Sequence, residues 1–201
     1  MRAFHELGRR VSKKLLYPPA RLMGRLGISP TVFTLFGLVL AVGAGVAFAF
    51  GRLRTGALLV LAAGFADMVD GAVARANESG SVFGAFMDSV VDRYSEAAYF
   101  TGLVYLYAAG RDTVMAVLAV LVLTGSLFVS YTKARAECLI DECKVGIMER
   151  PERVVILALG YLVGGYGPLA ALLLLAALTH FTAIQRILYT RARLASSSRE
   201  R

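Results

Sequence analysis

Four regularly spaced aspartates are the residues best suited to do chemistry in this sequence: Asp67, Asp70, Asp88 and Asp92. The first two lie three positions apart and the last two lie four apart, so on helices each pair would share one face. Four converging carboxylates would repel one another unless a cation lay between them. Because hard divalent cations prefer oxygen ligands, the spacing predicts a site for Mg²⁺ or Mn²⁺.

Small residues and one arginine accompany these aspartates. Gly71 and Ala74 follow the first pair on nearly the same face, and Gly84 lies four positions before Asp88. Small side chains let two helices, or a helix and a ligand, approach closely, although ordinary packing of membrane helices would explain any one of these glycines. Arg75 could neutralise the acidic group or bind a phosphate.

Six nearly uninterrupted apolar stretches must position these residues. Each is close to the length of about 20 residues that crosses a bilayer as a helix, although the fifth is short. The short loop between the second and third stretches makes them antiparallel, so that both aspartate pairs can face one point. We therefore predict an all-α integral membrane protein with six transmembrane helices, at residues 31–50, 56–74, 82–108, 113–132, 151–166 and 168–189.

The composition supports a membrane protein and orients it. The chain is 57% hydrophobic and only 18% charged, which argues against a soluble enzyme or a disordered binding protein. Of its 22 basic residues, all but Arg52, Arg54 and Arg111 fall on one side of the predicted spans. By the positive-inside rule, both termini and the aspartates lie on the cytoplasmic side of the cell membrane. The same rule accounts for the net charge of +8, so we expect no nucleic-acid partner.

The two ends of the chain are expected to differ from the membrane domain at residues 31–192. In residues 1–30, an apolar helical stripe faces away from basic residues, which is typical of an amphipathic helix at the cytoplasmic membrane surface. A basic arm that only sets the topology is an equal alternative. Residues 193–201 are rich in serine and arginine, and we expect a flexible basic tail.

A longer pattern contains all four aspartates and resembles the signature of the CDP-alcohol phosphotransferase family. Residues 67–92 read D-x2-D-G-x2-A-R-x8-G-x3-D-x3-D, and all eight defining positions match. The resemblance implies that an alcohol attacks the phosphorus of a CDP-linked donor and that CMP leaves. It implies two metal ions held by Asp67, Asp70 and Asp88, whereas Asp92 contacts metal and accepts the proton of the attacking hydroxyl. It also implies a homodimer.

The same resemblance implies a site for the CDP donor. Gly71, Ala74 and Arg75 would border the cytidine diphosphate. The hydroxyl groups of Ser81, Thr31 and Thr34 would also contact the donor, although hydroxyls at such positions also cap helices.

A second resemblance concerns the alcohol that accepts the lipid group. Residues 130–137, 145–153 and 185–186 resemble the branch that makes phosphatidylinositol phosphate or its archaeal ether-lipid equivalent. It implies that inositol 1-phosphate binds in a basic pocket of Lys133, Arg153 and Arg186. Arginine suits a phosphomonoester because its planar fork donates two hydrogen bonds, but these residues also satisfy the positive-inside rule. Arg135 and Arg150 would instead pair with Glu137, Glu149 or Glu152.

Several alternatives stay open at this point. Another acceptor such as glycerol phosphate, or a CDP-inositol donor giving di-inositol phosphate, would use the same aspartates. The donor's lipid could be diacylglycerol or archaeol. A divalent-cation transporter is a more distant alternative, because carboxylates inside membranes also mark ion pathways. Cys138 and Cys143 are expected to be reduced thiols without a role in the reaction.

Overall fold

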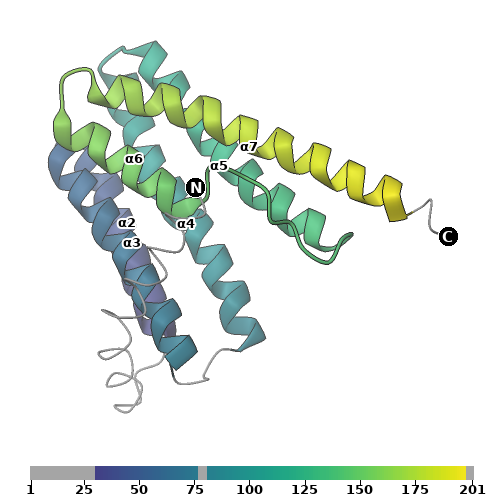
Figure 1. The fold of residues 1–201 in the computed structure, drawn as a ribbon. Coiled ribbons are helices and arrows are strands. Elements are labelled where there is room, and N and C mark those ends of the chain that lie inside the picture. The colour runs from purple at the N-terminus through teal and green to yellow at the C-terminus, as the bar shows by residue number, and fades with distance from the viewer. Residues whose placement is uncertain (1–29, 77–80, 198–201) are drawn as a thin grey trace.

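The computed structural model describes residues 30–76 and 81–197, and these residues form six α-helices (Figure 1). All six begin within three residues of their predicted starts, and the described residues contain no strand. The all-α prediction is therefore confirmed. The predicted amphipathic helix falls before Pro30 and lies outside the described residues. The helices are α2 (Pro30–Ala49), α3 (Leu53–Ala76), α4 (Val82–Ala109), α5 (Thr113–Glu137), α6 (Arg150–Val163) and α7 (Gly167–Ser197).

Four of these helices are long and apolar enough to cross a membrane: α2, α3, α5 and α7. This supports the prediction of a membrane protein. The other two differ for separate reasons: α4 carries Asp88, Asp92, Arg93 and Glu96, and α6 has only 14 residues. A count of six spans therefore stays a prediction.

The last helix continues further than predicted. α7 ends at Ser197, eight residues beyond the expected end at Tyr189, so residues 193–197, which we assigned to the tail, are helical. Alanine, arginine and leucine dominate this extension, and all three favour helices. With 31 residues, α7 is about 46 Å long, which exceeds the hydrocarbon core of about 30 Å.

The helices pack as two connected groups. α2 packs on α3 and α4, α5 packs on α4 and α7, and α6 packs on both α3 and α7. In Figure 1, α5 and α7 run together toward the C-terminus, whereas α4 leads away from them. α6 thus joins the aspartate-bearing helix α3 to the α5–α7 pair.

Two glycines bring α2 and α4 into direct backbone contact. A Cβ atom at Gly102 would fall on the carbonyl oxygen of Gly45, and a Cβ atom at Gly45 would fall on that of Ala98. No side chain fits at either position without moving a helix. The crossing matters for the site because α2 carries Thr34 and α4 carries Asp88 and Asp92.

A tight turn joins α6 to α7. Gly164 and Gly165 have φ angles of 74° and 56°, in the left-handed region that favours glycine. This turn ends α6 after 14 residues and directs α7 back along it.

Candidate active site

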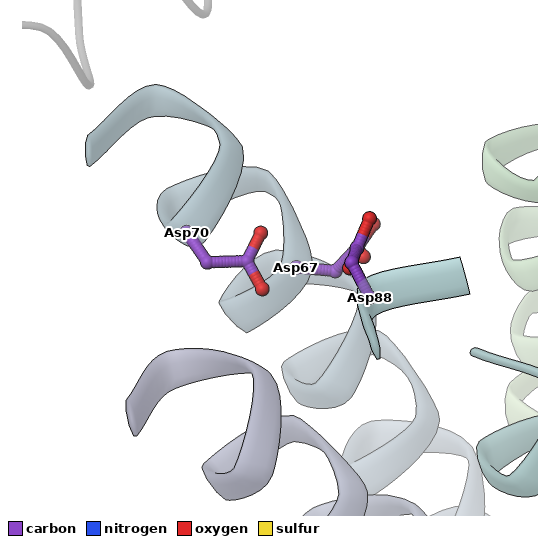
Figure 2. Close-up of side chains that lie close together, drawn as sticks. All are labelled: Asp67, Asp70 and Asp88. Atoms are coloured by element: carbon purple, nitrogen blue, oxygen red, sulfur yellow. The ribbon is translucent and has the colours of Figure 1, made fainter. Parts of the chain in front are cut away.

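Three of the four predicted aspartates converge. One carboxylate oxygen from each of Asp67, Asp70 and Asp88 lies within 4.8 Å of the others. Figure 2 shows that the first two side chains come from one helix and meet the third, which comes from the neighbouring helix α4. α2 packs on both α3 and α4, and the aspartates of these two helices together form an oxygen-rich cluster, which we call the aspartate cluster.

The environment of the aspartate cluster fits a divalent cation. Asp70 is 5% exposed, and its Oδ2 accepts a hydrogen bond of 2.8 Å from the Thr34 hydroxyl on α2. Asp88 Oδ1 is buried and has no hydrogen-bond partner among the described residues. A buried carboxylate oxygen without a partner is costly, and a bound cation would satisfy it. The donor set is also the all-oxygen set that Mg²⁺ and Mn²⁺ prefer.

Asp92 does not belong to this three-residue cluster but is linked to it by Arg150. Nη1 of Arg150 lies 2.8 Å from Asp92 Oδ1 and 2.7 Å from Asp67 Oδ1. Arg93 is also close, with Nη1 3.6 Å from Asp92 Oδ2. A single guanidinium therefore bridges α3 and α4.

This bridge corrects the predicted partners of Arg150. We expected it to pair with Glu137, Glu149 or Glu152, and that prediction is wrong, because Arg150 contacts Asp67 and Asp92. The physical reason is the packing of α6 on α3, which brings the first residue of α6 within reach of two carboxylates.

A cavity of about 380 Å³ opens beside Asp92, between α4, α5, α6 and α7. All three residues of the predicted acceptor pocket line it: Lys133, Arg153 and Arg186. The volume falls in the usual range for sites that bind small molecules. Its charged lining consists of Arg93, Lys133, Arg150, Arg153 and Arg186 together with Asp92, Glu96, Glu137 and Glu149.

The two buried arginines of this cavity are firmly held. Nη2 and Nε of Arg153 lie 2.6 and 3.2 Å from Glu96 Oε1, and its Nη1 donates to the carbonyl oxygen of Met148. Arg186 donates from Nε to the carbonyl oxygen of Val145 at 2.9 Å and from Nη1 to that of Val129 at 2.5 Å. These contacts preorganise the arginines and also tie the loop before α6 to the bundle.

Glu96 and Arg150 are two residues of the site that sequence reasoning missed. Glu96 lies four positions after Asp92 and eight after Asp88, so the helical period could have identified it. The contacts of Arg150 join residues 58 and 83 positions apart in sequence, and no local pattern predicts them.

Of the residues predicted to bind the CDP donor, some lie at the aspartate cluster and others do not. Thr34 contacts Asp70, and Gly71 follows Asp70 on α3. Thr31 is exposed at the start of α2, and Ser81 accepts a hydrogen bond of 2.9 Å from the backbone amide of Gly84, so that it caps α4. Ala74 and Arg75 lie in the last turn of α3, and their side chains are outside the described residues.

Comparison with known proteins places this arrangement in a family. The CDP-alcohol phosphatidyltransferase family matches residues 27–193 of the chain. The chain is 42% identical to archaetidylinositol phosphate synthase of Methanothermobacter thermautotrophicus over 174 residues, which are 85% of this chain and 87% of the relative. It is 43% identical to phosphatidylinositol phosphate synthase of Mycolicibacterium smegmatis over 149 residues, 73% of this chain and 67% of that one.

Solved structures agree with these sequence matches. Phosphatidylinositol phosphate synthase of Mycobacterium tuberculosis with bound CDP-DAG has a TM-score of 0.80 and 33% identity, covering 88% of this chain and 94% of the other. The same enzyme with manganese and citrate has a TM-score of 0.78 and 35% identity, covering 88% of both chains. Sequence motif, fold and aspartate cluster thus agree, and the chain belongs to the CDP-alcohol phosphatidyltransferase family.

Proposed function

We propose that this membrane enzyme transfers a phosphatidyl-type group from a CDP-linked lipid to inositol 1-phosphate and releases CMP. The observation that carries the proposal is the position of Asp92, which lines the cavity of Lys133, Arg153 and Arg186 and shares Arg150 with Asp67 of the aspartate cluster. A site for a diphosphate and a site for a phosphorylated alcohol are therefore adjacent. The relatives named for inositol phosphate lipids support this choice of acceptor.

The aspartate cluster would hold the metal. Asp67, Asp70 and Asp88 supply oxygen ligands, Asp92 could supply a fourth, and the Thr34 hydroxyl orients Asp70. Two bound divalent cations, Mg²⁺ or Mn²⁺, would neutralise the charge on the donor diphosphate and on the departing CMP. The manganese complex of the mycobacterial enzyme supports this assignment.

Asp92 is the proposed general base. It accepts the proton of the acceptor hydroxyl while the hydroxyl oxygen attacks the phosphorus next to the lipid. The bond between that phosphorus and the oxygen of CMP breaks, and CMP carries away the electron pair. A carboxylate suits this role because it can accept a proton and lies beside the acceptor cavity.

The two substrates bind on opposite sides of Asp92 in this proposal. Lys133, Arg153 and Arg186 bind the phosphate of the acceptor, which carries nearly two negative charges. Gly71, Ala74 and Arg75 border the cytidine diphosphate, and Thr31, Thr34 and Ser81 lie at its edges. We further propose a cytoplasmic active site in the cell membrane and a homodimer as the functional unit.

Release of CMP by the purified protein tests this function. The assay contains Mg²⁺ and CDP-diacylglycerol, with inositol 1-phosphate, free inositol, glycerol 3-phosphate or serine as the acceptor. Release only with inositol 1-phosphate is the expected result. Release with another alcohol would retain the role of the aspartates and refute the acceptor pocket. If none of the four acceptors gives CMP release, CDP-archaeol and CDP-inositol are the next donors to test. No CMP release with these donors would refute the reaction.

A further inference from the structure

Arg150 lies between the two halves of the site. Its Nη1 contacts one carboxylate of the aspartate cluster and the proposed base, at 2.7 and 2.8 Å. Its side chain is 17% exposed, and it lines the cavity that also contains Lys133, Arg153 and Arg186. Its Nε is buried and has no hydrogen-bond partner within residues 30–76 and 81–197. The guanidinium thus has bonding capacity that its present contacts do not use.

The present position of Arg150 conflicts with metal binding. The guanidinium contacts Asp67, whose carboxylate is one of the three that converge, and a cation on that carboxylate would repel it. Without a cation, the guanidinium instead offsets the charge of two aspartates from different helices. Arg150 and a divalent cation therefore compete for the same carboxylates.

The acceptor cavity offers Arg150 another partner. The cavity is lined by five cationic and four acidic side chains, so its own residues leave little excess positive charge for a phosphate. One of the five cations is Arg150, which Asp67 and Asp92 neutralise in the present arrangement. Released from them, its guanidinium could bind a phosphate as a planar two-pronged donor without leaving the cavity wall.

We propose that Arg150 exchanges partners during the reaction cycle. It is the counter-ion of Asp67 and Asp92 before metal binds, and it becomes a ligand of the acceptor phosphate once metal occupies the cluster. Metal and acceptor then bind cooperatively, since each favours the same position of Arg150. This inference rests on the proposed function, because that function supplies both the metal and the phosphorylated acceptor.

The first test measures metal affinity alone. Binding of Mn²⁺ to the purified full chain is followed by the electron paramagnetic resonance signal of free Mn²⁺, for wild type, Arg150→Gln, Arg150→Lys and Arg135→Gln. Arg135 is a matched control because it is an arginine exposed near the C-terminal end of α5 and does not line this cavity. We expect Arg150→Gln to bind Mn²⁺ at least threefold more tightly than wild type, with Arg150→Lys between them and the control unchanged.

Unchanged or weaker Mn²⁺ binding in Arg150→Gln would overturn the proposal. Misfolding cannot imitate the expected result, because a damaged cluster binds metal less tightly. If the glutamine variant does not fold, Arg150→Lys retains a charge and is judged by the same increase in affinity.

The second test measures the coupling. Calorimetric titration of wild type with inositol 1-phosphate is expected to give a severalfold higher affinity with Mg²⁺ than without it, and Arg150→Gln should lose this gain. A wild-type affinity that Mg²⁺ leaves unchanged would overturn the exchange.

The two proposals fail in different ways. Tighter Mn²⁺ binding in Arg150→Gln, with no CMP release from inositol 1-phosphate by wild type, would refute the acceptor and support the competition. CMP release with equal Mn²⁺ affinities would refute the exchange alone.

Discussion

At the scale of single residues, Asp92 connects the chemistry of the site. It lines the acceptor cavity, and through Arg150 it shares a cation with Asp67. The other three aspartates instead face one another within the cluster. This difference in position is the basis for the proposed division of roles, in which Asp67, Asp70 and Asp88 hold the metal and Asp92 accepts the proton.

Asp92→Asn is expected to lower the rate of CMP release by a factor of about 100 or more, because an amide cannot accept the proton. Mn²⁺ affinity should stay close to that of wild type, since the three converging carboxylates remain. Steady-state rates and Mn²⁺ titration of the same preparation check both parts. A variant with near-normal turnover would exclude Asp92 as the base.

Variants of the cations in the acceptor pocket are expected to differ in thermal stability, because only some of these cations also hold the fold together. Lys133→Ala is expected to raise the KM for inositol 1-phosphate about tenfold, because a charged hydrogen bond to the substrate is lost. Its thermal stability should change little. Arg153→Ala should raise the same KM and also lower the melting temperature, since it leaves Glu96 buried without its cation, which typically costs about 3–5 kcal/mol.

The KM for the CDP donor is the internal control for both variants. Equal increases in the two KM values would place the acceptor pocket elsewhere. A stable Arg153→Ala protein would mean that the pair with Glu96 contributes little to folding.

At the scale of helices, the crossing of α2 and α4 sets the spacing of the site. Gly45 and Gly102 let the backbones touch, and the same helices carry Thr34 and the second aspartate pair. The hydrogen bond between Thr34 and Asp70 also joins α2 to α3. A shift of α2 would therefore move the aspartates of both α3 and α4.

Two glycines of α2 provide a matched pair for this idea. A Cβ atom at Gly45 would collide with the backbone of Ala98, whereas one at Gly43 would lie 3.7 Å from Cδ1 of Leu59, an ordinary contact. Gly45→Ala is expected to lower stability by about 1–3 kcal/mol, as overpacking does, and to reduce CMP release. Gly43→Ala should match wild type in melting temperature and activity. Similar behaviour of both variants would show that the crossing tolerates a side chain.

How far the sequence predicts the structure differs between helices and contacts. The starts of all six helices follow from apolar stretches, and the convergence of Asp67, Asp70 and Asp88 follows from helical spacing and a short loop. The contacts of Arg150 could not be predicted in this way, because they depend on how α6 packs on α3. The end of α7 was missed for another reason: its last residues do not continue the apolar stretch, yet the alanines, arginines and leucine among them favour a helix.

At the scale of the whole molecule, the arrangement in the membrane decides which substrates reach the site. Cys138 is exposed just after α5, in the loop that leads to the acceptor cavity, whereas Arg52 is exposed in the turn between α2 and α3. The proposed topology places these positions on opposite sides of the membrane.

A membrane-impermeant maleimide is expected to label Cys138 in inverted vesicles but not in right-side-out cells. In a protein carrying Arg52→Cys, Cys138→Ser and Cys143→Ser, labelling should occur only from the outside. Mass spectrometry of the labelled chain measures both. Labelling of Cys138 from outside would reverse the orientation and place the active site on the other face.

The shortness of α6 has a consequence for how the two substrates meet. With 14 residues it is about 21 Å long, so when its turn to α7 lies at one edge of the hydrocarbon core of about 30 Å, Arg150 lies about 9 Å inside the other edge. The reaction then takes place below the level of the bilayer surface. The donor can react without being extracted from the lipid, and the inositol phosphate instead gives up part of its hydration to enter the protein. The basic residues at that depth replace the lost water. The water-soluble substrate therefore moves from the aqueous phase into the membrane, while the lipid substrate stays in the bilayer.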